Sequence, residues 1–398
     1  MLRHFKYFKF LTSLRGNIVL IELMMIVVYF SFTVYTGFTI VVKEGVIVKV
    51  VSSTYIKEYN YLCNKLTKIP VINRCEYLLE KKNGFLVNLI FIDTKIIKLN
   101  ITVFNNAYPS IINDLIKEQK RESFTQENYY NVIIAPFISK ESANLCEEAN
   151  VGYLDMSGNS RLLIGSLFIS EQGNQNKFVT KRSSKNIFDP FSKVSSLILR
   201  ELMGDISIIW KLSHLSKKLQ CSIGQVSKVK DYLCERLWAQ MTLDGLKILN
   251  PKAIMHSWSE AYSQKSTLFN MLDCYTLLSI QEFEDQLRQF RTETEIDCCL
   301  TGFAGGVRYT PVVRYNKVHL LIAEKDLQQF LEKSICKQVD SGANVQLHIV
   351  SSMEFFYRAQ VISNQLIASP VQVYLDCMRL KGRTKEIVEA VFSKEIAK

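Results

Sequence analysis

QCSIGQVSKVKDYLCERLWAQMTLDGLKIL, residues 220–249, is the stretch that decides the fold of the middle of the chain. It opens with a capping box, because Ser222 is followed three residues later by Gln225. In a capping box the hydroxyl caps the amide at the third helical position and the glutamine bonds back to the N-cap amide. A helix is therefore predicted from 223 to 236. Apolar residues recur along it at helical spacing, which predicts a buried side made of Val226, Val229, Leu233 and Leu237.

The residues on either side complete a small domain. Upstream, 191–203 and 209–219 have apolar residues at helical spacing. Downstream, Asp244-Gly245 separates two short apolar stretches, as in a two-residue β-hairpin. Three helices and a hairpin predict a winged helix-turn-helix over residues 186–262.

The same block holds most of the chain's excess positive charge. The 398 residues carry 49 Lys and Arg and 38 Asp and Glu, a balance of 49 − 38 = +11. Residues 181–262 contribute 13 − 7 = +6, whereas residues 263–398 are balanced. A basic surface favours polyanionic partners such as nucleic acid or an anionic membrane. An ordinary solvated surface is the alternative interpretation.

We expect the capped helix to enter the major groove of double-stranded DNA as a recognition helix. Its lysines would contact phosphate, and Gln225 and Ser227 would contact base edges. The candidate DNA-binding residues are Lys217, Lys218, Ser222, Gln225, Ser227, Lys228 and Lys230. The alternative is a winged helix that is used only for protein contacts.

Residues 51–180 alternate between helical and strand patterns. Helices are predicted at 54–68, 109–120 and 139–149, and strands at 84–93, 96–104, 131–136, 151–155 and 161–170. Such alternation is typical of a parallel or mixed sheet covered by helices. Asp155, which precedes Met-Ser-Gly-Asn, is expected to form a rigid turn.

Part of this segment resembles a known family. APFIS at 135–139 and GYLDMSGN at 152–159 lie within residues 131–163, which resemble the N-terminal domain of AbiEi-type antitoxins. These proteins are proposed to be the regulatory halves of bacterial type IV toxin–antitoxin, abortive-infection systems. SPVQVYLDCMRLKGRTKEIVEAV, residues 369–391, resembles the C-terminal signature of the same family.

The resemblance implies a restriction-endonuclease-like domain at 51–180 and a winged helix that represses its own promoter. It also implies a partner, a nucleotidyltransferase-like toxin. A nuclease of that fold needs an acidic residue followed by an Asp/Glu-x-Lys motif, because the carboxylates hold a divalent cation and the lysine activates water. In the family's pattern Thr102 stands at the acidic position and Phe104 at the lysine position. Neither side chain can bind a metal ion as a carboxylate does or activate water.

We therefore expect no catalytic residue, no metal site and no cofactor, and a protein that is not an enzyme. The alternative is a metal-dependent nuclease that acts through Asp93-Thr94-Lys95, with Glu76 and Glu80 upstream.

Residues 263–398 read as a further α/β domain. Helices are predicted at 269–290, 325–333, 371–378 and 384–397, and strands at 317–322 and 345–350. The glycines between 301 and 306 lack the Gly-Lys-Ser/Thr of a phosphate-binding loop, so close helix packing explains them better.

The first 50 residues form an apolar segment outside the resemblance. Residues 17–42 carry one charge, Glu22, and their length satisfies a single membrane span, so a membrane-anchored DNA-binding sensor is a further alternative. The stretch is also rich in Val, Ile, Phe, Tyr and Thr, so part of it could be buried strand, and a start placed too far upstream is a third interpretation. The ten cysteines form no Cys-x-x-Cys pair and read as reduced thiols, which favours the cytoplasm.

The sequence thus predicts a multi-domain α/β protein that binds operator DNA as a transcriptional repressor, the antitoxin of a type IV toxin–antitoxin operon. Its four parts are predicted at 1–50, 51–180, 186–262 and 263–398. The operator sequence, the identity of the toxin and the oligomeric state are not predicted.

Overall fold

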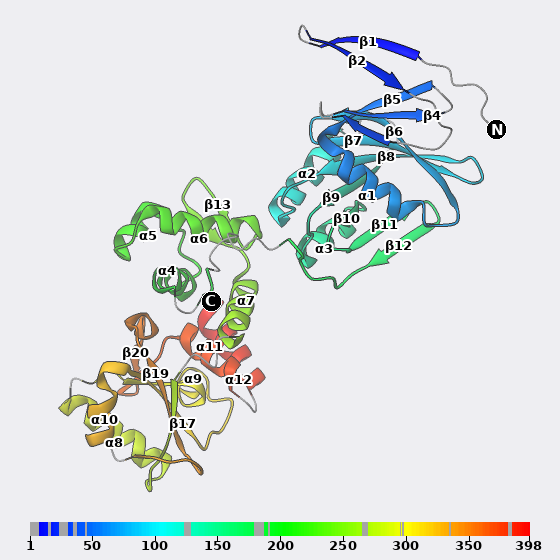
Figure 1. Cartoon of the computed structure of the whole chain (residues 1–398). Helices are drawn as coiled ribbons and strands as arrows, with labels where there is room; N and C mark the ends of the chain where they lie inside the picture. The colour runs from blue at the N-terminus through cyan, green and yellow to red at the C-terminus, as the bar shows by residue number, and fades with distance from the viewer. Residues whose placement is uncertain are drawn as a thin grey trace. The chain divides into compact units, whose positions relative to one another are not determined.

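The structure is a computed structural model that describes residues 8–14, 17–23, 31–34, 38–43, 46–122, 129–178, 187–189, 192–264, 270–294, 296, 298–333, 336–380 and 384–398; side chains are described from 54 onward, except 121, 122 and 292. The chain forms two compact units, Met1–Val179 and Thr180–Lys398 (Figure 1). Each unit is described by itself.

The first unit is built on a seven-stranded mixed sheet. Its strands are β6 (Ile72–Lys81), β7 (Gly84–Phe91), β8 (Ile96–Val103), β9 (Tyr130–Ala135), β10 (Gly152–Asp155), β11 (Ser160–Ile164) and β12 (Leu167–Glu171). The spatial order is β12-β11-β10-β9-β8-β7-β6. Strands β8, β9 and β10 run parallel, and the other neighbours run antiparallel.

Helices cover both faces of this sheet. They are α1 (Ile56–Leu66), α2 (Pro109–Glu122) and α3 (Lys140–Glu148). Side chains of α1 share a core with Val132 and Ile134 of β9. Side chains of α2 and α3 share a core with Ile133 and Ala135, the alternate residues of the same strand. A strand buried on both faces reads as a continuous apolar run, which is why NVIIAP predicted it.

Most elements predicted for 54–170 are present, with two corrections. The predicted strand 161–170 is wrong as a single element, because β11 and β12 form a hairpin there and Gly165 turns with a φ of +62°. A left-handed φ costs glycine little, so the chain reverses at that point. Strand β6 was not predicted, since its residues are mostly exposed or half-buried and show no regular alternation.

The N-terminal segment is described as strands. These are β1 (Phe8–Leu14), β2 (Asn17–Leu23), β3 (Ser31–Val34), β4 (Phe38–Lys43) and β5 (Val46–Ser52). Strands β1 and β2 pair with each other, and β3, β4 and β5 form a separate antiparallel sheet. Within the described ranges, no helix is long and apolar enough to cross a membrane. The alternative prediction of a membrane span at 17–42 falls on β2, β3, β4 and residues outside the description.

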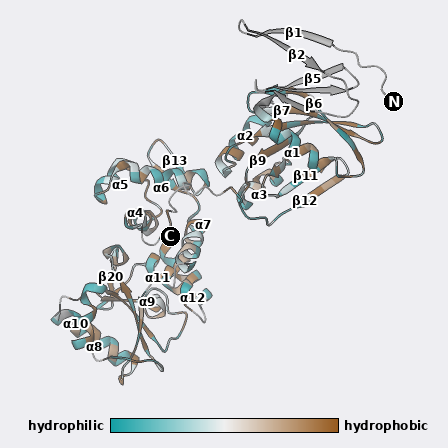
Figure 2. Cartoon of the chain, in the orientation of Figure 1, coloured by the Kyte–Doolittle hydropathy of each residue, from teal (hydrophilic) through white to brown (hydrophobic). Residues whose placement is uncertain are grey.

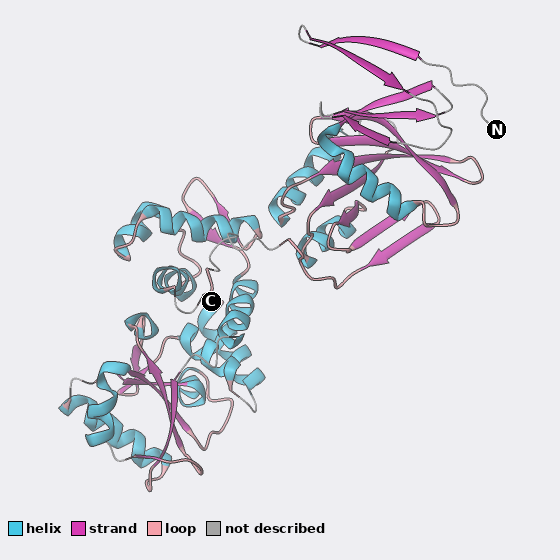
Figure 3. Ribbon diagram, in the orientation of Figure 1, coloured by secondary structure: helices cyan, strands magenta, loops and turns pink. Residues whose placement is uncertain are grey.

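The second unit begins with helices and a hairpin. They are α4 (Lys193–Gly204), α5 (Leu212–Lys218), α6 (Ile223–Glu235), β13 (Ala239–Met241), β14 (Leu246–Ile248) and α7 (Pro251–Gln264). Figure 3 shows α4, α5 and α6 grouped beside the hairpin. Three helices and the hairpin follow the predicted order; α7, with a proline at its first position, was not predicted.

The rest of the second unit is a mixed α/β layer structure. Its strands are β15 (Asn270–Tyr275), β16 (Cys298–Thr301), β17 (Val318–Ala323), β18 (Lys337–Gln338), β19 (Val345–Val350), β20 (Gln360–Ile362) and β21 (Gln365–Ile367), and its helices are α8 (Ile280–Glu293), α9 (Gly302–Tyr309), η3 (Glu324–Asp326), α10 (Leu327–Lys333), η4 (Met353–Phe356), α11 (Pro370–Arg379), α12 (Thr384–Val391) and the π turn η5 (Phe392–Ile396). The strand order is β18-β15-β19-β17-β16-β21-β20.

Alternate residues of β17 again separate two cores. Leu320 and Ile322 pack with α8 and α10, whereas Leu321 belongs to the core of α9, α11 and α12. That second core also contains buried residues of α4, α6 and α7, so the helical part and the α/β part share one apolar interior. In Figure 2 the strands are largely brown, while α8 and α10 carry teal residues.

The predicted helix 269–290 is wrong in its first half. Asn270–Tyr275 is strand β15, and the helix that follows, α8, starts only at Ile280. Ser279 and Glu282 form a capping box there, which sets the start of α8. Strand β15 pairs with β19, more than 70 positions along the chain, and this long-range pairing overrides the local helical pattern.

Candidate nucleic-acid interface

Helix α6 has the capping box that its sequence predicts. The Ser222 hydroxyl accepts a hydrogen bond from the backbone N–H of Gln225 at 3.2 Å. The side-chain oxygen of Gln225 accepts one from the backbone N–H of Ser222 at 3.0 Å. The first turn is therefore held by two reciprocal bonds, and Ser222, Ile223, Gly224 and Gln225 are all exposed. The N-terminal end of α6 is both rigid and accessible.

The opposite side of α6 is packed into the core. Val226, Val229 and Leu233 are buried, as predicted. Leu237 is not part of this side, because α6 ends at Glu235 and Leu237 lies beyond it with a φ of +59°. The buried stripe fixes which side of α6 faces outward.

The predicted DNA-binding lysines differ in what they already contact. Lys217 and Lys228 are exposed, and neither pairs with a described acidic group. Lys230 forms an ion pair with Asp231. Lys218 is bound to Glu201 at 2.6 Å and lies 5.1 Å from the centre of the Trp210 ring. Two of the four ammonium groups are thus unpaired within the described part.

The side chain of Gln225 also makes hydrogen bonds within the protein already. Its side-chain oxygen is held in the capping box by Ser222, so only its amide NH₂ group remains to donate outward. A glutamine that reads adenine uses both its oxygen and its nitrogen. Gln225 is therefore a donor to acceptor atoms such as purine N7, and Ser227, half-buried in the next turn, is a second polar group nearby.

The hairpin after α6 is held at a defined position. Trp210, just before α5, exchanges two backbone hydrogen bonds with Leu246 at 2.9 and 2.8 Å and so forms a single-residue β-bridge to β14. A Cβ atom on Gly245 would lie 2.5 Å from the Trp210 carbonyl oxygen, so only glycine fits there.

The predicted turn dipeptide is displaced by one residue. Thr242 and Gly245 exchange backbone hydrogen bonds, so Leu243 and Asp244 occupy the turn rather than Asp244 and Gly245. Leu243 is fully exposed at the tip.

A buried carboxylate joins the helices to the α/β part of the same unit. Glu201 of α4 has no exposed side-chain surface. It accepts hydrogen bonds from Lys218 at 2.6 Å, Tyr357 at 2.7 Å and Arg358 at 3.2 Å. Burial opposes the charged form, but the bonds from Lys218 and Tyr357 and the charge of Arg358 together lower the pKa of Glu201 below its ordinary value. Glu201 is therefore held as a carboxylate.

A second polar network lies deeper between the same parts. Arg200 donates to Gln372 at 2.6 Å, and Gln372 in turn donates to Tyr262 at 2.9 Å. Tyr262 donates to Asp376 at 3.3 Å, and Asp376 also accepts a bond from Thr301 at 2.5 Å. All five side chains are buried. Buried polar groups that bond to one another favour a single arrangement of the elements that carry them, here α4 and α7 against α11 and β16, although Nη1 of Arg200 has no hydrogen-bond partner.

The residues of the nuclease alternative lie apart from such networks. Asp93, Thr94 and Lys95 form the exposed turn between β7 and β8, where Thr94 has a φ of +68° and the Asp93 carboxylate accepts the Lys95 amide. Thr102 lies on β8, and Phe104 follows its end. Among the described residues, no group of three His, Cys, Asp or Glu side chains could hold a metal ion.

Asp155 forms the rigid turn that was predicted. It is fully buried, and its carboxylate accepts bonds from the amides of Ile138, Gly158 and Asn159 and from the Asn159 side chain, all between 2.8 and 3.0 Å. With its acceptor positions filled from within, Asp155 holds the ends of β9 and β10 together.

The ten cysteines are all free, as expected of reduced thiols. Six of them are buried and four are partly exposed, so the expectation of buried thiols holds for six.

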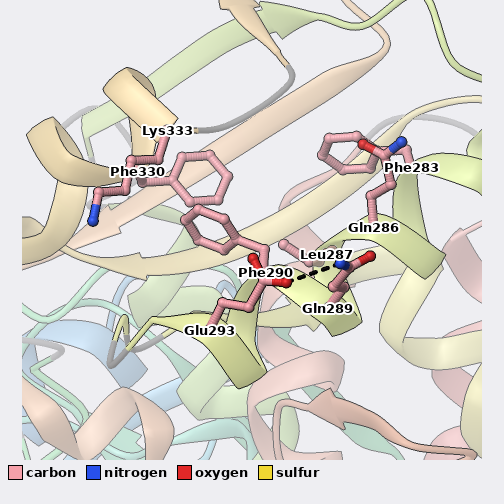
Figure 4. Close-up of a pocket in the computed structure, with 8 residues that line it drawn as sticks. All are labelled: Phe283, Gln286, Leu287, Gln289, Phe290, Glu293, Phe330 and Lys333. Atoms are coloured by element: carbon pink, nitrogen blue, oxygen red, sulfur yellow. Dashed lines mark hydrogen bonds between the residues drawn. The ribbon is translucent and has the colours of Figure 1, made fainter.

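A small pocket opens between α8 and α10 (Figure 4). Its volume is about 230 Å³. Phe290 and Phe330 pack edge to face in its wall, with their ring centroids 5.4 Å apart. Its lining residues are Phe283, Gln286, Leu287, Gln289, Phe290, Glu293, Phe330 and Lys333. Ligand pockets usually exceed about 300 Å³ and converge several polar groups, so we assign it no ligand.

Comparison with known proteins addresses the second unit. Residues 247–397 match the family described as "Transcriptional regulator, AbiEi antitoxin, Type IV TA system". The matched region runs from β14 through α7 and the whole α/β part, and it contains Tyr262, Gln372 and Asp376 of the buried network. No curated protein and no solved structure matches the chain. The family resemblance expected from the sequence is thus confirmed for residues 247–397, which are similar to the AbiEi antitoxin family of type IV toxin–antitoxin transcriptional regulators.

Proposed function

We propose that this transcriptional regulator binds double-stranded DNA through a winged helix formed by α4, α5, α6 and the β13–β14 hairpin. It would repress its own toxin–antitoxin operon, with a nucleotidyltransferase-like toxin as partner and the cytoplasm as its place of action. The observation that carries the proposal is α6: a rigidly capped helix, packed by one side, whose exposed start presents Ser222 and Gln225.

The charges around α6 support a phosphate-binding role. Lys228 on α6 and Lys217 at the end of α5 are exposed and have no acidic partner among the described residues. Lysines in that state have all their donors available to phosphate, whereas Lys218 and Lys230 already give one to a carboxylate. We therefore rank Lys217 and Lys228 above Lys218 and Lys230 as phosphate contacts. Gln225 would donate to a purine edge at the N-terminal end of the helix.

The test is DNA binding at several salt concentrations. Fluorescence anisotropy with duplex DNA from upstream of the protein's own gene is expected to show binding whose logarithm falls linearly with log salt. Charge reversal by Lys228→Glu should flatten that slope by about 0.9, the value for one lost phosphate contact. The matched control is Lys333→Glu, an exposed lysine of the same unit on α10, which should leave the slope unchanged. An unchanged slope in Lys228→Glu would refute the role of α6.

Two other functions remain distinguishable by experiment. If the protein binds no DNA but co-purifies with its partner toxin, the helices and hairpin serve protein contacts only. If purified protein nicks plasmid DNA in Mg²⁺ or Mn²⁺, the nuclease alternative through Asp93 and Lys95 gains support. We propose that the chain is not an enzyme, because Asp93 and Lys95 lie in an exposed turn and Thr102 and Phe104 cannot replace the missing motif.

A further inference from the structure

Glu201 carries an unusual combination of donors for one buried carboxylate. One donor, Lys218, comes from α5, beside the proposed DNA-binding helix. The other two, Tyr357 and Arg358, come from the loop after η4 in the α/β part, more than 150 positions along the chain. The carboxylate therefore links the two parts of the second unit through side chains alone.

The approach of Arg358 to α4 is close and specific. Its guanidinium also donates to the Gly204 carbonyl at 3.2 Å, and a Cβ on Gly204 would lie 2.5 Å from its Nε atom. Arg358 itself has a φ of +60°, a conformation that non-glycine residues rarely adopt. The loop is thus held in a strained conformation that places the guanidinium against α4.

The charges in this group decide what Lys218 can do. Lys218 and Arg358 are cations and Glu201 is the one carboxylate to which both donate, so the hydrogen-bonded group has a net charge of +1 + 1 − 1 = +1. About half of the Lys218 side chain is exposed, whereas the Glu201 side chain is not. Arg358 is about one third exposed, so both cations of the group reach solvent, and Lys218 is the more exposed of the two. Without Arg358, Glu201 and Lys218 would neutralise each other.

We propose that Arg358, assisted by Tyr357, is a positioning residue for DNA binding: by sharing the Glu201 carboxylate it leaves the Lys218 ammonium available to a DNA phosphate. This inference rests on the proposed DNA-binding function. It makes the α/β part of the unit a determinant of DNA affinity, although none of its residues needs to contact DNA.

The experiment is a double-mutant cycle measured by anisotropy on the same duplex DNA across a salt series. Arg358→Gln is expected to flatten the slope of log affinity against log salt by about 0.9, which corresponds to roughly fivefold weaker binding near 0.15 M salt. Arg358→Lys keeps the charge and should restore the slope, which a purely structural role would not predict. Arg358→Gln and Lys218→Gln should be non-additive, because both remove the same phosphate contact.

Lys217→Gln is the matched control. Lys217 is the neighbouring exposed lysine of α5 and has no bond to Glu201, so its effect should add to that of Arg358→Gln. Additivity of Arg358→Gln with Lys218→Gln, or an unchanged slope in Arg358→Gln, would overturn the inference. Wild-type protein that binds no DNA would instead refute the proposed function, and this inference with it.

Glu201→Gln keeps the test decisive if Arg358→Gln does not fold. The amide has the shape of the carboxylate without its charge, so no buried charge loses its partner. Lys218 would then be available to phosphate without help from Arg358, so the variant should keep at least the affinity and salt slope of the wild type. In the Glu201→Gln background, adding Arg358→Gln should have no further effect on the slope. If Arg358→Gln still flattened the slope in the Glu201→Gln background, this would count against the inference as firmly as an additive cycle.

Discussion

Acidification is expected to destabilise the second unit through a buried pair of histidines. His319 of β17 and His348 of β19 lie on adjacent parallel strands, with Nδ1 of one 3.1 Å from Nε2 of the other. Both are buried. The pKa of each is lowered to about 3, mainly by burial, and the neighbouring His348 contributes to the shift at His319. Arg379 acts on His348 in the same direction, while Asp376 and Asp273 oppose the shift at His319.

The sign follows from the direction of these shifts. The folded pKa values of about 3 lie below the unfolded value of about 6.5, so the unfolded chain binds protons that the folded chain does not. The contribution of the neutral histidine pair to the free energy of unfolding is fully present above about pH 6.5. It is lost as the pH falls from there toward 3. Each pH unit below 6.5 lowers the free energy of unfolding by about 1.4 kcal/mol for each histidine. At about pH 5 the loss is therefore about 2 kcal/mol for each histidine and roughly 4 kcal/mol for the pair.

Urea unfolding of the full chain at pH 7.5 and pH 5, followed by the tryptophan fluorescence of the second unit, measures this difference. All three tryptophans, Trp210, Trp238 and Trp258, lie in that unit. The double variant His319→Asn with His348→Gln keeps polar groups near the two facing nitrogens but cannot titrate, so it should lose most of the pH dependence. His214→Gln, an exposed histidine on α5, controls for loss of a histidine outside the pair. Equal pH dependence in wild type and the double variant would refute the assignment.

Three further changes test the local geometry. Ser222→Ala removes the helix cap of α6 and should lower the free energy of unfolding by about 1 kcal/mol in the same urea assay; an equal loss in Gln225→Ala would show that the box is reciprocal. Gly245→Ala places a Cβ 2.5 Å from the Trp210 carbonyl and should destabilise the unit more than Gly342→Ala, which shares a positive φ but has open space around it. Neither wild-type protein nor Asp93→Ala should nick plasmid DNA in Mg²⁺ or Mn²⁺. Metal-dependent nicking by the wild type that Asp93→Ala abolishes would show instead that the turn at 93–95 is catalytic.

Local sequence patterns were sufficient for elements whose signals lie within a few residues. The capping box of α6 depends on Ser222 and Gln225 alone, and both hydrogen bonds are present. The buried run of β9 and the helical spacing of α2 and α3 likewise predicted their elements. The family resemblance is confirmed over residues 247–397, where the chain matches a family of transcriptional regulators.

Patterns failed where distant partners decide the local conformation. Residues 270–275 show a helical pattern but form a strand, because β19 supplies its hydrogen bonds. The Asp-Gly dipeptide predicted a turn, yet the turn lies at Leu243 and Asp244, since Gly245 pairs with Thr242 and Trp210 bridges the next residue, Leu246.

The sequence by itself determined which residues could form a basic, capped helix, because periodicity, capping and charge are properties of neighbouring residues. Only the tertiary structure decided how those residues are used. It showed that Lys218 is tied to a buried carboxylate while Lys228 is free of any described acidic partner. The donors on that carboxylate, Lys218 and Arg358, are 140 positions apart. No local pattern encodes their meeting, since it depends on the shared core that brings α4 and the loop after η4 together.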